Sequence, residues 1–102
     1  MIDIIYKKSY QYSSDRIKIY SRAIGNNIFS CYGYFQYLDE RYRFNIYIED
    51  NILTVRINDE VKFSMNATSE CFQTSIERIE RIILGGKNGR IDQRNSILQF
   101  AR

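Results

Sequence analysis

Histidine, tryptophan and proline are all missing from this chain of 102 residues, and cysteine occurs only twice. Histidine is the one side chain whose unperturbed pKa lies near neutrality, so its absence removes the commonest general acid and base. A structural zinc site usually needs four Cys or His ligands at short spacings, and these are missing as well. We therefore predict that the protein is not an enzyme and that it holds no metal and no cofactor.

The chain also has no apolar segment that approaches the length of a membrane span. Its first residues include Asp3 and no long apolar stretch, unlike a secretory signal. The apolar content of 44% and the charged content of 26% are typical of a globular domain, and the length fits one domain over residues 1–102. We expect a cytoplasmic protein without membrane contact, in which Cys31 and Cys71 are reduced, buried thiols.

Tyrosine is abundant and unevenly placed, because all nine copies lie in the first 47 residues. Tyrosine favours β-structure and combines a large apolar ring with a hydrogen-bonding end. This concentration indicates an antiparallel sheet with an aromatic, hydrogen-bonding exposed face.

The strongest periodic pattern covers residues 41–65, where apolar and polar residues alternate as in half-buried strands. Two acidic or amide-rich segments, residues 49–51 and 58–60, interrupt the alternation and have the composition of short turns. The pattern predicts a three-stranded antiparallel meander over 41–65.

Three further segments upstream read as strands. Residues 28–38 are aromatic on both faces and are expected to form an interior strand joined to the meander through Asp39 and Glu40. Residues 16–24 alternate like a strand, although Ser13 to Asp15 could cap a helix and Gly25 could end one; alternation favours the strand. Residues 2–6 are expected to form another strand.

After Met65 the apolar period changes to that of a helix. Phe72, Ile76, Ile79 and Ile83 recur at spacings of four, three and four, which predicts an amphipathic helix over about 69–84 that packs on the sheet. The predicted fold class is therefore α+β, with an antiparallel sheet of about five strands packed by one C-terminal helix.

The net charge of +3 comes from the end of the chain. Residues 1–86 contain eleven basic and eleven acidic residues, whereas residues 87–102 contain four basic residues and Asp92 alone. This basic tail is apolar enough near Phe100 to dock as a short helix or as an edge strand. Four scattered charges are a small footprint for binding phosphate.

Two other motifs invite a catalytic or phosphate-binding interpretation. The adjacent acids Asp39–Glu40, Glu49–Asp50 and Asp59–Glu60 fall in predicted turns, and neighbouring side chains on a strand diverge, whereas a working carboxylate pair must converge. The glycine-rich segment 85–90 follows a helix, so it faces the negative end of the helix dipole, unlike a phosphate loop. The acid pairs are better explained as turns, and the glycine-rich segment is better explained as a flexible helix C-cap and linker.

The remaining candidate site is the face of the sheet that points away from the predicted helix. Alternation places on it a field of tyrosine, arginine and small polar residues: Lys18, Tyr20, Arg22, Tyr32, Tyr34, Gln36, Arg43, Asn45, Tyr47, Thr54, Arg56, Lys62 and Ser64. Tyrosine and arginine are the residues enriched at protein interfaces. We select six of them as partner-binding residues: Tyr20, Tyr32, Tyr34, Arg43, Tyr47 and Arg56. The alternative to a binding site is that another part of the chain covers this face of the sheet.

These features predict a small non-catalytic protein-binding domain, as a monomer or a homodimer. The most concrete form is a stoichiometric inhibitor, such as an immunity protein that neutralises a cognate bacterial toxin, or a phage-type inhibitor of a host factor. The alternative is a nucleic-acid-binding module that uses the same face and the basic tail. Residues 32–37 contain a glycine among aromatics but lack the preceding basic residue and following small residue of RNA-recognition sheets, which favours a protein partner.

Overall fold

The computed structural model describes residues 1–85. The elements follow one another as helix α1 (Ile2–Gln11), strands β1 (Ile17–Gly25), β2 (Ile28–Tyr37), β3 (Glu40–Glu49), β4 (Ile52–Ile57) and β5 (Glu60–Asn66), and helix α2 (Cys71–Leu84). The α+β class, the meander and the C-terminal helix are confirmed. The basic tail from residue 87 lies outside the described residues.

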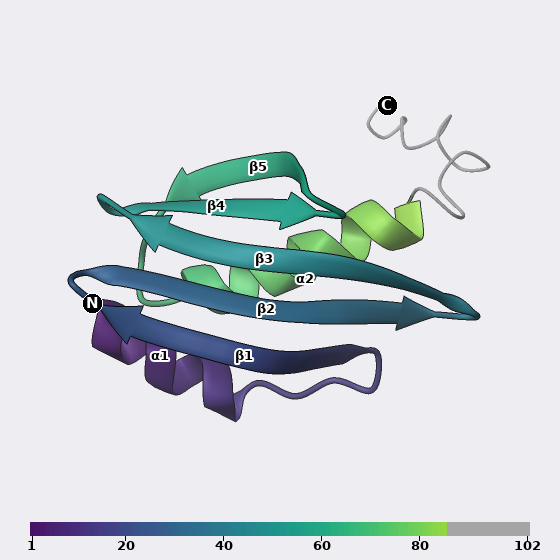
Figure 1. The fold of residues 1–102 in the computed structure, drawn as a ribbon, viewed down its shortest axis with the longest axis horizontal. Coiled ribbons are helices and arrows are strands. Elements are labelled where there is room, and N and C mark those ends of the chain that lie inside the picture. Colours follow the sequence, from purple (N-terminus) through teal and green to yellow (C-terminus); the bar gives the residue numbers. More distant parts are fainter. Residues whose placement is uncertain (86–102) are drawn as a thin grey trace.

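The five strands form one antiparallel sheet in the order β1-β2-β3-β4-β5, so each strand pairs with its neighbour in sequence (Figure 1). Every connection within the sheet has two residues. Three of these turns have positive φ at both central positions, as in type I′ hairpins: Asn26–Asn27, Asp50–Asn51 and Asn58–Asp59. Asparagine and aspartate tolerate this left-handed backbone better than other residues with a side chain. The turn between β2 and β3 lies at Leu38–Asp39, one residue earlier than expected.

Both helices lie on the same side of the sheet, behind it in Figure 1. Helix α1 packs against β1 and β2, α2 packs against β4, and the two helices contact each other. Phe72 of α2 is at the centre of this layer, with its ring 6.2 Å from that of Phe29 on β2 and 6.2 Å from that of Tyr12. The predicted stripe of α2 is buried. The core therefore occupies the space between the helices and one face of the sheet.

Helix α1 corrects the expectation of a strand at residues 2–6. The isoleucines suggest β-structure because they are β-branched, but Ile2, Ile5 and Ser9 recur at spacings of three and four and face the core. Asp3 in the first turn and a lysine in the last turn also suit the helix dipole. The sheet keeps five strands without this segment because residues 16–24 belong to β1, as predicted.

The edge strand β1 contains a β-bulge at Tyr20, between Ile19 and Ser21 in the register. The extra residue moves every later side chain to the opposite face. Arg22 consequently pairs with Cys31 and points to the helices, so its expected place on the exposed face is wrong. Its guanidinium donates from Nε to Ser9 Oγ (2.9 Å) and from Nη2 to the Ser9 carbonyl (3.0 Å), and it lies 4.0 Å from the Tyr10 ring centroid.

The other edge strand, β5, also has a register shift, at Lys62. Val61 thereby pairs with Arg56 and is 54% exposed, whereas simple alternation groups it with Phe63 and Met65 in the core. Lys62 itself forms an ion pair with Glu60 at 3.0 Å. Interruptions of this kind on both edges hinder pairing with further strands.

Cys31 and Cys71 are free and buried, as predicted. Burial raises the pKa of the Cys31 thiol to about 12, although the nearby Arg22 charge lowers it slightly. Burial also raises the pKa of Cys71. Both thiols are therefore protonated at neutral pH and are poor nucleophiles. No helix within residues 1–85 has the length and apolar content needed to cross a membrane.

Candidate protein-binding face

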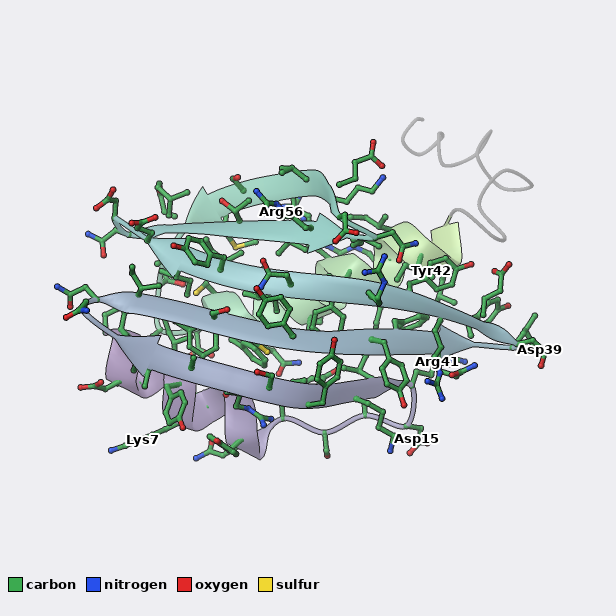
Figure 2. All side chains as sticks on the ribbon, viewed as in Figure 1. Lys7, Asp15, Asp39, Arg41, Tyr42 and Arg56 are labelled. Atoms are coloured by element: carbon green, nitrogen blue, oxygen red, sulfur yellow. The ribbon has the colours of Figure 1, made fainter. Side chains whose placement is uncertain are left out.

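The face of the sheet opposite the two helices is here named the open face (Figure 2). Its side chains form rows across the strands, because paired residues point the same way. One row runs from Lys18 through Tyr34 to Arg43. The next row runs from Tyr32 through Asn45 to Arg56, and a third joins Tyr47 to Thr54 and Ser64.

Four of the six predicted partner-binding residues surround one hollow on the open face. Its volume is about 160 Å³, and the side chains that line it come from β1 to β4 and the β4–β5 turn: Tyr20, Tyr32, Arg43, Asn45, Arg56 and Asp59. The bulge presents Tyr20 at one rim, where it is 63% exposed, and Tyr32 is 46% exposed beside it. Two tyrosines and two arginines thus converge on a single point.

Arg43 is held in place by the turn that follows β4. Its guanidinium Nη2 lies 3.2 Å from Asp59 Oδ2, and its backbone N–H donates to Asn58 Oδ1 at 3.0 Å. Both charged side chains are well exposed, so this ion pair contributes little to stability, at most about 1 kcal/mol. Another carboxylate can therefore replace Asp59 beside Arg43 at a small cost in free energy.

Arg56 differs from Arg43 because it makes no ion pair or side-chain hydrogen bond among residues 1–85. It is the penultimate residue of β4 and is exposed, and Figure 2 labels it over that strand. An exposed guanidinium offers five N–H donors in a planar fork. Arg56 is thus the most available donor around the hollow.

Tyr34 lies beside the hollow and belongs to a packed polar cluster. Its ring centroid is 6.5 Å from that of Tyr20 and 4.4 Å from the guanidinium carbon of Arg41. Arg41 in turn donates to Gln36 Oε1 at 3.1 Å, and Gln36 donates to the Leu38 carbonyl at 2.8 Å. These contacts limit the rotamers of Tyr34 and Arg41, which lowers the entropy lost when a partner binds them.

Tyr47, the sixth predicted residue, lies in the next row and does not line the hollow. Its hydroxyl donates to Glu49 Oε1 at 3.1 Å, and this hydrogen bond to a carboxylate raises the pKa of Tyr47. The open face therefore brings together Tyr20, Tyr32, Arg43 and Arg56, has Tyr34 adjacent, and leaves Tyr47 at its margin.

Three residues of this region were not among the six: Arg41, Asn45 and Asp59. Alternation already places Arg41 and Asn45 on the same face as Arg43, so their pattern was visible in the sequence. Asp59 was interpreted only as a turn residue. Its pairing with Arg43 depends on the register of β3 and β4, which brings the β4–β5 turn beside Arg43. Alternation does not reveal that register.

A larger hollow, of about 430 Å³, lies where the start of α1 meets the β1–β2 and β3–β4 turns. Within the part of the chain that the structure describes, its lining includes Glu49 and Asp50 and no lysine or arginine. Two carboxylates beside a helix N-terminus already satisfy the positive end of that dipole. Among the described residues, no group of three or more Cys, Asp or Glu side chains is placed to hold a metal ion.

Comparisons of the chain with protein-family models, with curated proteins and with solved structures found no match. Function is therefore inferred from the geometry of the open face.

Proposed function

We propose that this protein is a non-catalytic binding domain that holds one protein partner on its open face. Its most concrete form is a stoichiometric inhibitor, such as an immunity protein that neutralises a bacterial toxin or a phage-type inhibitor of a host factor. The observation that carries the proposal is the convergence of Tyr20, Tyr32, Arg43 and Arg56 on one hollow, with Arg56 unpaired among residues 1–85. Interface hot spots are rich in tyrosine and arginine.

The proposal can be tested by affinity capture of the tagged, full-length protein from its native cells, with and without nuclease, followed by mass spectrometry. One protein recovered in stoichiometric amount after nuclease treatment is the expected result. Recovery of many nucleic-acid-associated proteins that vanish with nuclease would contradict it.

A double charge reversal, Arg43→Glu with Arg56→Glu, is expected to weaken binding to the captured partner by well over tenfold. Each substitution replaces a donor fork with a repelling carboxylate at the centre of the proposed interface. The dissociation constant can be measured by isothermal titration calorimetry. The matched control is Lys7→Glu with Arg81→Glu, because both residues are exposed on the helix side. Equal affinity of the folded double variant and the control would remove the open face as the interface.

Binding of single-stranded nucleic acid is the second candidate. It is favoured by four basic side chains on the open face, Lys18, Arg41, Arg43 and Arg56, beside exposed tyrosine rings on which bases can stack. Its signature would be a steep fall in affinity with rising salt, because phosphate contacts release counterions. The Arg43–Asp59 pair argues against it, since a carboxylate occupies one of the four basic groups.

A further inference from the structure

The hollow on the open face is smaller than a typical small-molecule pocket. Such pockets are about 300–1,000 Å³, whereas this hollow measures about 160 Å³. A hollow of this size accommodates one side chain. Its occupant is therefore sought among the side chains of a partner protein.

The charge and donors around the hollow define the chemistry of that side chain. Arg43 and Arg56 both line it, and among residues 1–85 only the exposed Asp59 opposes them. Asn45 pairs with Arg56 in one row and lies two residues after Arg43 on β3. It donates one N–H to the Cys31 carbonyl at 3.2 Å, which fixes its amide beside the hollow. Convergent N–H donors with a net positive charge select an anionic acceptor.

The ion pair between Arg43 and Asp59 shows, within this protein, how a carboxylate binds a guanidinium at the hollow. A carboxylate from the adjacent turn already approaches one guanidinium of the hollow to 3.2 Å, while the second guanidinium, on Arg56, has no such partner within residues 1–85. The rings of Tyr20 and Tyr32 stand at the rim and can cover the stem of an inserted side chain.

From this arrangement we propose that the hollow seats one glutamate or aspartate side chain of the partner protein, held bidentately by Arg56 and flanked by Tyr20 and Tyr32. The inference deepens the proposed function and rests on it. A carboxylate is planar and matches the guanidinium fork with two parallel hydrogen bonds, which lysine cannot provide.

The first test is an NMR titration of the labelled full-length protein at low ionic strength. The probes are a glutamate-rich decapeptide, a glutamine analogue of the same length and a ten-nucleotide oligothymidylate. The glutamate peptide is expected to shift the Arg56 side-chain N–H and the Asn45 side-chain amide, and the glutamine peptide is not. If the glutamate peptide left the side-chain signals of Arg56 and Asn45 unshifted, the inference would be overturned. Binding of oligothymidylate at the hollow that is tighter than binding of the glutamate peptide would also overturn it.

The second test compares three substitutions at one position and one control. Arg56→Gln is expected to lower affinity for the glutamate peptide at least about tenfold, since a charge-assisted hydrogen-bond pair is lost. Arg56→Lys should be intermediate because it keeps the charge without the fork, Arg56→Ala should resemble Arg56→Gln, and Arg81→Gln on α2 should bind like the parent chain. If the affinity of Arg56→Gln for the glutamate peptide were within twofold of that of the parent chain, the proposed carboxylate site would be contradicted.

Binding measurements with the captured partner protein distinguish failure of this inference from failure of the proposed function. Tyr32→Ala tests the open face as an interface, and Arg56→Gln tests the carboxylate seat. Weaker partner binding by both variants supports both claims. Weaker binding by Tyr32→Ala alone overturns the seat and leaves the open face as the interface, whereas unchanged binding by both overturns the two together.

Discussion

Replacing Gly33 with alanine is expected to lower the free energy of unfolding by about 3 kcal/mol, the upper part of the usual range for an overpacked core. Gly33 lies on β2 between Ile19 of β1 and Phe44 of β3. A Cβ atom there would be 2.3 Å from the Lys18 carbonyl oxygen and 2.8 Å from Cζ of Phe44. The first neighbour is backbone next to the β1 bulge and cannot move without disturbing the sheet. Urea unfolding followed by circular dichroism measures the change.

Gly25 supplies the matched control, because an added Cβ there meets no atom within 4 Å and its φ is not in the left-handed region. Gly25→Ala is expected to leave stability unchanged or to raise it by less than about 1 kcal/mol. Similar stability of the two alanine variants would show that Gly33 is not required for close strand packing.

Replacing Arg22 with alanine is expected to destabilise the protein by about 2–3 kcal/mol, which is the second largest effect. Two charge-assisted hydrogen bonds to Ser9 and the cation–π contact with Tyr10 are lost together. Ser9 is fully buried, so its hydroxyl and carbonyl would lose partners that water cannot easily replace. Thermal unfolding checks the value.

Lys18→Ala on the same strand is the control for Arg22→Ala. Lys18 is exposed on the open face and makes no ion pair within the described part of the chain, so its loss should change stability by no more than about 0.5 kcal/mol. Arg22→Lys should fall between them, because one ammonium cannot satisfy both Ser9 acceptors in the same geometry. If Arg22→Ala matched Lys18→Ala, Arg22 would not anchor α1.

The strands and α2 could be predicted because each leaves a periodic trace. Alternation along 41–65 and the change of period at Phe72 each reflect one buried face, and Asn or Asp at the turns supplies residues that tolerate positive φ. Helix α1 was not predicted because the β-branched Ile2, Ile4 and Ile5 are equally compatible with a strand. The helical spacing of its buried residues rests on only two positions, Ile5 and Ser9.

The bulges in β1 and β5 could not be predicted from the alternation of apolar and polar residues. An extra residue at Tyr20 or Lys62 is invisible to alternation along one strand, since it is defined by the count of residues on the neighbouring strand. Arg22 and Val61 were therefore assigned to the wrong faces. The interior strands β2 to β4 pair without a shift within either ladder, so Tyr32, Asn45 and Arg56 lie on the face that their parity indicates. The two-residue turns set the register that places these residues in one row.

The strand order has a consequence for the chain entropy of assembly. Each ladder of the sheet closes a loop of only two residues, whereas the Lys8–Glu70 ion pair joins α1 to the start of α2 across a separation of 62 residues. Loop-closure entropy rises with the length of chain enclosed. The sheet is thus composed of local contacts, and the helix layer supplies the long-range closure. The open face belongs to the part of the fold whose closure costs the least entropy.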